Sequence, residues 1–187
     1  MVKQIIEKVE PLRTAEEIKN MREALQQTNY AKRNILLFNL GINTGLRISD
    51  ILNIKVEDVR GKTSIYIREK KTNKKRQVYL DSMLVELTDY LAEIDPEDSY
   101  LFESRRKGRP ISTVQAYRML ASAGEACGYD YVGTHTLRKT FGFHYYKKTK
   151  DIATLMYMFN HDSQSVTKRY IGITDEEVKD SLKDFRL

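Results

Sequence analysis

Apolar residues recur at helical spacing near the start of the chain. Thr14 and Glu17 have the spacing of a capping box, in which each side chain accepts a hydrogen bond from the other residue's backbone. Ile18, Met21 and Leu25 then follow at helical intervals, which places them on one face. The pattern therefore predicts an amphipathic helix that begins directly after Thr14.

A second, more strongly apolar helix is predicted from about residue 31. Its apolar residues are typical of a helix in the centre of a core: Ile35, Leu36, Leu37, Phe38 and Leu40. We expect this helix to break near the sequence NTG, where Gly45 can adopt a positive φ. Arg47 follows the break and begins a short amphipathic turn. Three apolar residues share a face of this turn: Ile48, Ile51 and Leu52.

The pattern then switches to a period of two residues. Ile65 and Ile67 alternate with residues that point the other way, and Val78 and Leu80 alternate similarly after the sequence KKTNKK. Two alternating segments joined by polar residues predict an antiparallel β-hairpin with cations at its tip.

Further apolar repeats predict helices along the rest of the chain. One helix is marked by the repeat from Leu84 to Ile94 and is stopped by Asp95-Pro96, because the residue before a proline disfavours helical backbone angles. The others are a helix capped by Ser112 and Gln115, one beginning at His135 with Thr134 as its cap, one over 152–159, one around 166–170 and one capped by Thr174 with Glu177. The predicted fold class is therefore α+β, mainly α, with a small antiparallel sheet.

Length and composition narrow the class of protein. At 187 residues the chain is long enough for one domain with a full core. No apolar run approaches the roughly 20 residues that span a bilayer, and the N-terminus has acidic residues where a secretory signal would be apolar. The single cysteine, Cys127, has no Cys/His cluster near it in the sequence. We therefore expect a cytoplasmic protein without a membrane segment or a metal site.

Positive charge is clustered along the chain. Lys and Arg number 32 against 26 Asp and Glu, a net charge of +6. The cations gather in residues 68–76 (REKKTNKKR) and 105–109 (RRKGR). One such run is usually a solvated loop, but several runs favour a polyanionic partner.

His135 and Arg138 are the first candidates for chemistry. They lie three residues apart on a predicted helix, so that both side chains reach one ligand. The apolar stripe of Leu137, Phe141 and Tyr145 lies on another face, and we therefore expect neither candidate to be needed for core packing. The same spacing also occurs by chance in many helices.

Arg47 is the second candidate, because it directly follows the predicted glycine turn between the apolar residues Leu46 and Ile48. An arginine anchored in this way suits the binding of two phosphate oxygens by its planar fork. The alternative is a structural ion pair with Asp50, and the two roles are compatible.

Tyr170 is the third candidate, with Lys168 and Arg169 directly before it and His161 nine residues before it. In a chain with 12 tyrosines the default for any one is a packed ring with its hydroxyl at the surface. A phenol becomes a nucleophile when cations stabilise its phenolate or a base takes its proton. Arginines, histidines, a lysine and a tyrosine, without an acid pair or a metal cluster, fit transesterification at a phosphodiester. This chemistry needs no cofactor.

Three motifs together resemble the tyrosine recombinase, or phage integrase, family. They are TGLRISDIL (44–52), HTLR (135–138) and HDSQSVTKRY (161–170), and KKTNKKRQVYL resembles the family's β-hairpin with its catalytic lysine. The ordered set is specific, although each motif alone is weak, and the resemblance covers about residues 11–185.

The resemblance implies a role for each site residue. Arg47 and Arg138 would bind the scissile phosphate and stabilise its transition state. His135 would act as general acid and base, and His161 would hydrogen-bond to the phosphate. Lys71 would protonate the leaving 5′-oxygen, and Tyr170 would attack to leave a 3′-phosphotyrosine. Asp50 would support the motif that carries Arg47.

The resemblance also implies partners. We expect double-stranded DNA as substrate, no metal or other cofactor, and a homo-oligomer that is a tetramer on DNA and weak or monomeric without it. The expected DNA-binding cations are Lys70, Lys74, Lys75, Arg76, Arg105, Arg106, Lys107, Arg109, Lys139 and Lys168. Two alternative functions stay open: DNA relaxation of the type IB topoisomerase kind, and a DNA-binding accessory protein that does not cut.

The sequence departs from the family pattern at three places. Phe159-Asn160 stands where Leu-Gly often precedes the second histidine, which would alter the turn that presents His161. Lys139 takes a place often held by histidine, with little expected consequence. We expect residues 1–10 to form a short arm and residues 11–187 a catalytic domain, without the N-terminal core-binding domain of most members.

Overall fold

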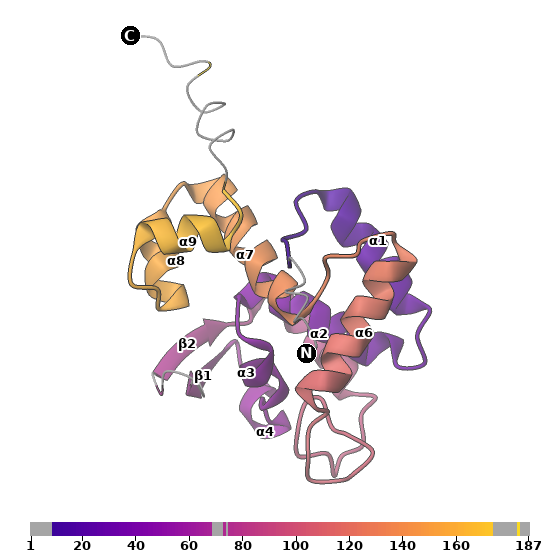
Figure 1. The fold of residues 1–187 in the computed structure, drawn as a ribbon. Coiled ribbons are helices and arrows are strands. Elements are labelled where there is room, and N and C mark those ends of the chain that lie inside the picture. Colours follow the sequence, from indigo (N-terminus) through magenta and orange to yellow (C-terminus); the bar gives the residue numbers. More distant parts are fainter. Residues whose placement is uncertain (1–8, 69–72, 74, 174–182, 184–187) are drawn as a thin grey trace, which may run out of the picture.

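A computed structural model describes residues 9–68, 73, 75–173 and 183 of the chain, and Figure 1 shows how its elements are arranged. The elements follow in this order: α1 (Ala15–Gln26), α2 (Ala31–Thr44), α3 (Ile48–Leu52), α4 (Val56–Val59), β1 (Ser64–Arg68), β2 (Lys75–Tyr79), the 3-10 helix η1 (Asp81–Met83), α5 (Leu84–Leu91), α6 (Thr113–Ala126), α7 (Thr134–Thr149), α8 (Ile152–Phe159) and α9 (Gln164–Tyr170). The predicted class, mainly helical with a small antiparallel sheet, is confirmed.

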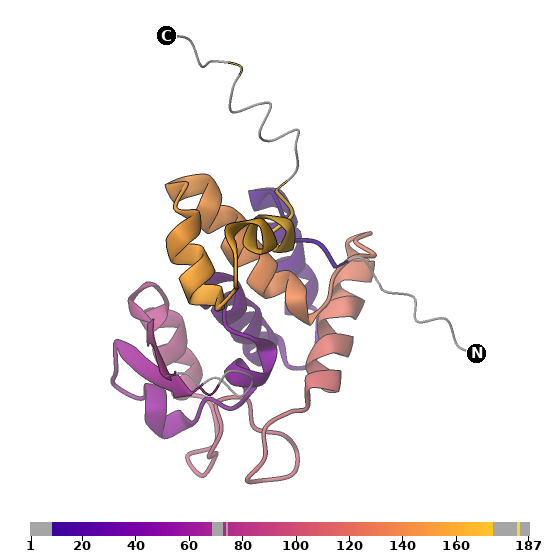
Figure 2. The same cartoon turned by 60° about the vertical axis from the view of Figure 1, so that its left-hand side comes forward.

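Helix α7 passes between two groups of helices (Figures 1 and 2). Helices α1, α2 and α6 lie on one side of it, and α8 and α9 lie together on the other. The main core is formed between α1, α2, α6 and α7 by side chains that are fully or almost fully buried: Met21, Leu25, Leu36, Leu37, Phe38, Leu40, Leu120 and Leu137. Since consecutive residues of α2 are buried, this helix is the central core helix that its composition predicts.

The predicted antiparallel hairpin is present. Strands β1 and β2 pair antiparallel, with Ser64 opposite Tyr79 and Arg68 opposite Lys75. Ile65 and Val78 face each other across the pair and are buried, whereas Tyr66 is exposed. The apolar face of the hairpin therefore packs on the core, as the alternation indicates.

The predicted helix ends are mostly confirmed. Thr14 with Glu17 and Ser112 with Gln115 each form a capping box. Gly45 ends α2 in the left-handed conformation with φ 63°, which a residue without a Cβ adopts at little cost.

Two predicted ends are wrong. Helix α5 ends at Leu91 rather than continuing to Ile94, and Asp95 organises a turn beyond it: its backbone carbonyl accepts from Asp98 N at 2.9 Å and its side chain accepts from Glu97 N at 2.9 Å. Helix α7 begins at Thr134, and its N-cap is Gly133 rather than Thr134. The helix predicted after Thr174 lies outside the described residues.

A second, smaller core cluster lies beyond α7. Leu155 and Phe159 of α8 and Ile171 after α9 are completely buried in it. Gly142 lets this cluster approach the α7 backbone, since a Cβ at that position would stand 2.6 Å from Ile171 Cγ2 and 2.8 Å from Phe159 Cε2. The small cluster thus fixes α8 and α9 against α7.

We expect Gly142→Ala to destabilise the protein by about 1–3 kcal/mol, although alanine is the better helix former, because the added methyl overpacks this contact. The measurement is urea unfolding of both proteins. An alanine variant as stable as the parent would show that α8 and α9 do not pack as tightly as described.

Candidate active site

Arg138 lies at the junction of three segments. Its side chain is 3% exposed. Its Nη1 donates to the Gly45 carbonyl at 2.5 Å and its Nη2 donates to the Phe159 carbonyl at 3.0 Å. The guanidinium also lies over the Phe159 ring, with Cζ 4.1 Å from the centroid. The expectation that Arg138 is not needed for packing is therefore wrong: this arginine joins α7 to the ends of α2 and α8.

Arg47 acts on the same region from an earlier part of the chain. The left-handed turn at Gly45 ends α2, and Arg47 is the partly buried N-cap residue of α3. The charges of Arg47 and of Arg138 both act on the ionisation of His161 and of Tyr170. The two arginines, far apart in the chain, thus both lie close enough to His161 and Tyr170 to act on their ionisation.

Asp50, the predicted supporting residue, is buried on α3. Its Oδ1 accepts from Ser49 Oγ at 3.5 Å. The predicted ion pair between Asp50 and Arg47 stays a prediction.

Tyr170 is the last residue of α9, and its hydroxyl meets two side chains of α7. It lies 3.1 Å from Nδ1 of His135, and Arg138 is close enough to act on its ionisation. Burial raises the pKa of Tyr170 above its ordinary value, while the positive charges of Arg138 and Arg47 oppose the rise. The hydroxyl is thus a neutral phenol at neutral pH, beside a group that can take its proton.

His161 stands directly after the turn that ends α8. Asn160 occupies the left-handed region with φ 50° and ψ 53°, and His161 N donates to the Met156 carbonyl at 3.1 Å. Asparagine tolerates this conformation better than most residues. The departure from Leu-Gly therefore leaves a tight helix-ending turn before the histidine.

The ring of His161 packs beside the tyrosine. Its centroid lies 5.1 Å from that of Tyr170 and 5.4 Å from that of Phe159. Burial and the charges of Arg138 and Arg47 lower the pKa of His161 below its ordinary value, and Asp162 acts in the opposite direction. The protonated form of this histidine is disfavoured as long as those arginine charges are not neutralised.

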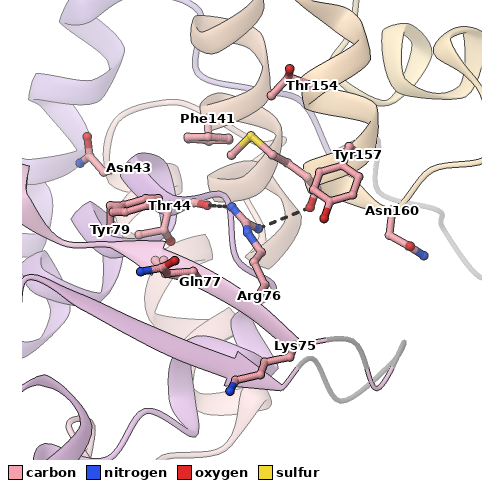
Figure 3. Close-up of a pocket in the computed structure, with 12 residues that line it drawn as sticks. Asn43, Thr44, Lys75, Arg76, Gln77, Tyr79, Phe141, Thr154, Tyr157 and Asn160 are labelled. Atoms are coloured by element: carbon pink, nitrogen blue, oxygen red, sulfur yellow. Dashed lines mark hydrogen bonds between the residues drawn. The ribbon is translucent and has the colours of Figure 1, made fainter.

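Arg76 links the hairpin to the same segments. Figure 3 shows its guanidinium reaching from β2 across a cavity of about 480 Å³ that is also lined by Phe141 and Tyr157. Nη2 donates to the Thr44 carbonyl at 2.8 Å and Nη1 donates to the Met158 carbonyl at 3.4 Å. The Thr44 and Met158 carbonyls directly precede the Gly45 and Phe159 carbonyls that accept from Arg138. Arg76 and Arg138 therefore both stabilise the turns before Arg47 and His161.

Three lysines of the predicted site lie outside the described residues: Lys70, Lys71 and Lys74. The predicted role of Lys71 therefore stays a prediction. Lys75, at the start of β2, is exposed, with Nζ 4.3 Å from the centre of the Tyr66 ring.

The other predicted DNA-binding cations fall into two groups. Three line a cavity of about 530 Å³ at the start of α6, and they are Arg105, Arg106 and Arg109. Lys107 beside them pairs with Asp95 and Asp98 at 2.6 Å each. Lys139 and Lys168 instead lie near the tyrosine: Lys139 Nζ is 5.5 Å from the Tyr170 ring centre and donates to the Val9 carbonyl at 2.5 Å, and Lys168 precedes Tyr170 on α9. DNA contact by these cations stays a prediction.

Two residues that contact the predicted site residues were not themselves predicted. Phe159 supplies the ring under Arg138, and Thr167 is fully buried with its hydroxyl 3.1 Å from Nδ1 of His161. A signal for Thr167 was present in the sequence, because it lies three residues before Tyr170 and thus on the same helical face. Nothing in the sequence indicates that Phe159 packs on an arginine.

Among residues 9–68, 73, 75–173 and 183, no three His, Cys, Asp or Glu side chains gather in a way that would hold a metal ion. Within those same residues, none of the helices has the length and apolar character that crossing a membrane requires.

The fold matches that of solved tyrosine recombinase structures. A crystal structure of XerA recombinase aligns with 95% of this chain and 67% of that one, with a TM-score of 0.75 and 24% identity. A post-cleavage complex of the XerH recombinase with its palindromic difH substrate aligns with 93% of this chain and 52% of that one, with a TM-score of 0.75 and 21% identity.

Sequence comparison establishes the family. Residues 13–177 match the Phage integrase family. The chain is 47% identical over 178 residues to the probable integrase/recombinase YoeC of Bacillus subtilis, covering 95% of this chain and 97% of that protein. It is 32% identical over 174 residues to the tyrosine recombinase XerA of Pyrococcus furiosus, covering 91% of this chain and 60% of XerA. The chain therefore belongs to the phage integrase family of site-specific tyrosine recombinases, enzymes that cleave and rejoin DNA, and the resemblance seen in its motifs is confirmed.

Proposed function

We propose that this recombinase cleaves DNA with Tyr170 as its nucleophile and leaves a 3′-phosphotyrosine and a free 5′-hydroxyl. The observation that carries the proposal is the environment of one hydroxyl. Tyr170 Oη lies 3.1 Å from Nδ1 of His135, within the fields of Arg138 and Arg47. The proposed nucleophile, a base and two cations lie near one another there.

The direction of the hydrogen bonds gives His135 its role. In the proposed arrangement the Tyr170 hydroxyl donates to Nδ1 of His135, while Arg138, which can only donate, acts on the phenol oxygen. As the phenol oxygen bonds to phosphorus, its proton passes to this nitrogen. His135 is thus a general base during cleavage and a general acid when the step reverses.

Arg47 and Arg138 would hold the scissile phosphate and stabilise the charge of the pentavalent transition state. A guanidinium has five N–H groups, which allows Arg138 to serve the backbone carbonyls and a phosphate oxygen together. His161 would donate a hydrogen bond to the phosphate, and Asp50 would support the segment of Arg47. Lys71 would give a proton to the departing 5′-oxygen.

Rejoining follows when a 5′-hydroxyl of a partner strand attacks the phosphotyrosine, so that the energy of the phosphodiester is conserved. Two strands must then be exchanged between DNA sites, which requires more than one protomer. A λ integrase tetramer has been crystallised on a Holliday junction. We propose that this chain likewise acts on double-stranded DNA as a homo-oligomer in the cytoplasm, with residues 11–187 as its catalytic domain.

The experiment that tests the proposal uses a nicked suicide duplex carrying the recognition sequence, in which the cleaved 5′-end diffuses away. A covalent protein–DNA adduct on a denaturing gel is the expected result. No adduct, on a duplex that the protein demonstrably binds, would contradict the proposal. Relaxation of supercoiled plasmid without recombinant product would instead indicate an activity of the type IB topoisomerase kind.

DNA affinity should depend strongly on salt, because clustered cations bind phosphates by releasing counterions. We expect duplex affinity to fall at least about tenfold when salt rises from about 50 to about 200 mM. Fluorescence anisotropy with a labelled duplex measures this dependence. A flat titration would show that the cations of residues 68–76 and 105–109 do not face the DNA.

A further inference from the structure

The buried hydroxyl of Thr167 lies between His161 and the backbone of its own helix. Thr167 is completely buried on α9. Its Oγ1 lies 3.1 Å from Nδ1 of His161 and 3.1 Å from the carbonyl oxygen of Ser163, four residues earlier. Thr167 is one turn from Tyr170 on the same helix, but its hydroxyl is directed at the neighbouring histidine.

A hydroxyl has a single hydrogen, so these two contacts cannot both be donated. The Ser163 carbonyl can only accept, and a helical threonine typically donates to the carbonyl four residues before it. With the hydrogen used in that way, Oγ1 accepts, and Nδ1 of His161 must be the donor. The Ser163 carbonyl, the Thr167 hydroxyl and Nδ1 of His161 then all have hydrogen-bond partners. If the hydroxyl donated to Nδ1 instead, its hydrogen bond to the Ser163 carbonyl would be lost.

We propose that Thr167 is a positioning residue that keeps a hydrogen on Nδ1 of His161, so that Nε2 is the only nitrogen of this ring that gains or loses a proton during the reaction. His135 has the other tautomer, with no hydrogen on Nδ1, since its Nδ1 accepts from Tyr170 if the cleavage chemistry proposed above is correct. The two histidines of the cluster thus differ in tautomer because α9 gives each a different hydroxyl.

The tautomer has a consequence for DNA binding, and this part rests on the proposed function. Phosphodiester oxygens only accept hydrogen bonds, and a neutral ring with hydrogen on Nδ1 has a lone pair at Nε2. His161 can therefore donate to the phosphate only after Nε2 takes up a proton. Binding of the scissile phosphate should accordingly be coupled to proton uptake by this ring.

The charged and titratable groups around His161 favour such coupling. Arg138 of α7 and Arg47 before α3 both lower the pKa of His161, Asp162 beside it opposes them, and Tyr170 of α9 packs against the ring. A phosphate that neutralises the two arginines removes their effect. The imidazolium that is disfavoured in the free protein then becomes favourable in the complex.

The tautomer is tested in the DNA-free protein, with ¹⁵N-labelled histidine and long-range ¹H–¹⁵N correlation at about pH 8, where the ring is neutral. A His161→Gln variant assigns the signals. We expect His161 to carry its hydrogen on Nδ1. Finding the hydrogen on Nε2 in the unmodified protein would overturn the proposal without any further variant.

The role of the hydroxyl is tested with a matched pair of substitutions. Thr167→Val keeps the shape and removes the hydroxyl, and Thr167→Ser keeps the hydroxyl. The Nδ1–H form should persist in the serine variant and lose population in the valine variant. Persistence of the Nδ1–H form in folded Thr167→Val would show that something else fixes the ring.

Proton uptake is measured by titration calorimetry of a duplex at one pH in buffers of different ionisation enthalpy, with Tyr170→Phe in every protein to prevent cleavage. We expect uptake by His161 of up to about one proton per bound site. Uptake should fall in Thr167→Val and in the His161→Gln reference, and equal uptake in all three would overturn the coupling. Because the tautomer is measured in the DNA-free protein, that measurement does not depend on whether the protein cleaves DNA.

Discussion

Tyr170→Phe is expected to abolish the covalent adduct with a nicked suicide duplex, lowering adduct formation by at least about a thousandfold. The substitution removes only the hydroxyl oxygen that would bond to phosphorus. The ring contacts with Phe159 and His161, at centroid distances of 5.6 and 5.1 Å, do not depend on that oxygen. Fold and DNA affinity should therefore be retained while cleavage is lost. The measurement is a time course on a denaturing gel.

Tyr157→Phe provides the matched control. Tyr157 lies on the neighbouring helix α8 and is 86% exposed, so the same chemical change there should leave adduct formation within about twofold of the parent. An adduct that persists in Tyr170→Phe would place the nucleophile on another residue and would remove the basis of the proposed mechanism.

Arg138→Lys is expected to lower cleavage by about 10²–10³-fold, the usual effect of removing one donor that stabilises a transition-state charge. A lysine has one compact ammonium and cannot reproduce the planar fork that spans the Gly45 and Phe159 carbonyls. We also expect a loss of stability of about 1–3 kcal/mol, because a buried carbonyl is left without its partner. Single-turnover cleavage and thermal unfolding should be measured on the same preparation.

Arg22→Lys separates catalysis from the general cost of replacing an arginine. Arg22 is exposed on α1 and donates to Asn39 Oδ1 at 2.9 Å, away from the cluster. Its substitution should leave cleavage within about twofold. If Arg138→Lys lost stability but cleaved at the parent rate at a temperature where both proteins are folded, the role of Arg138 would be structural alone.

The burial of Arg138 explains why it was wrongly predicted to take no part in packing. The sequence places His135 and Arg138 on a face without apolar residues, which suggests that neither takes part in packing. Arg138 is nevertheless buried, because the Phe159 ring and two backbone carbonyls from other segments surround it. Helical periodicity describes one helix and contains no information on what another segment brings against its polar face.

Local signals predicted the elements well, because they act between residues that are close in the chain. The capping boxes at Thr14 and Ser112, the left-handed turn at Gly45 and the alternation of β1 and β2 all have this character. The end of α5 was predicted at Ile94 rather than Leu91, and the start of α7 at His135 rather than Thr134, since local sequence does not define helix ends sharply.

By itself the sequence determined the kind and order of most elements, though not of α4 and η1, and it determined the family and the set of side chains that suits phosphoryl transfer. Only the tertiary structure decided that Arg47, His135, Arg138, His161 and Tyr170 meet, that Arg76 and Arg138 brace the turns before Arg47 and His161, and that Thr167 hydrogen-bonds to a histidine. The physical reason is the distance along the chain over which each kind of interaction acts. Spacing along the chain fixes backbone conformation within a few residues, whereas burial, hydrogen-bond direction and pKa depend on groups that are neighbours only after the core has formed.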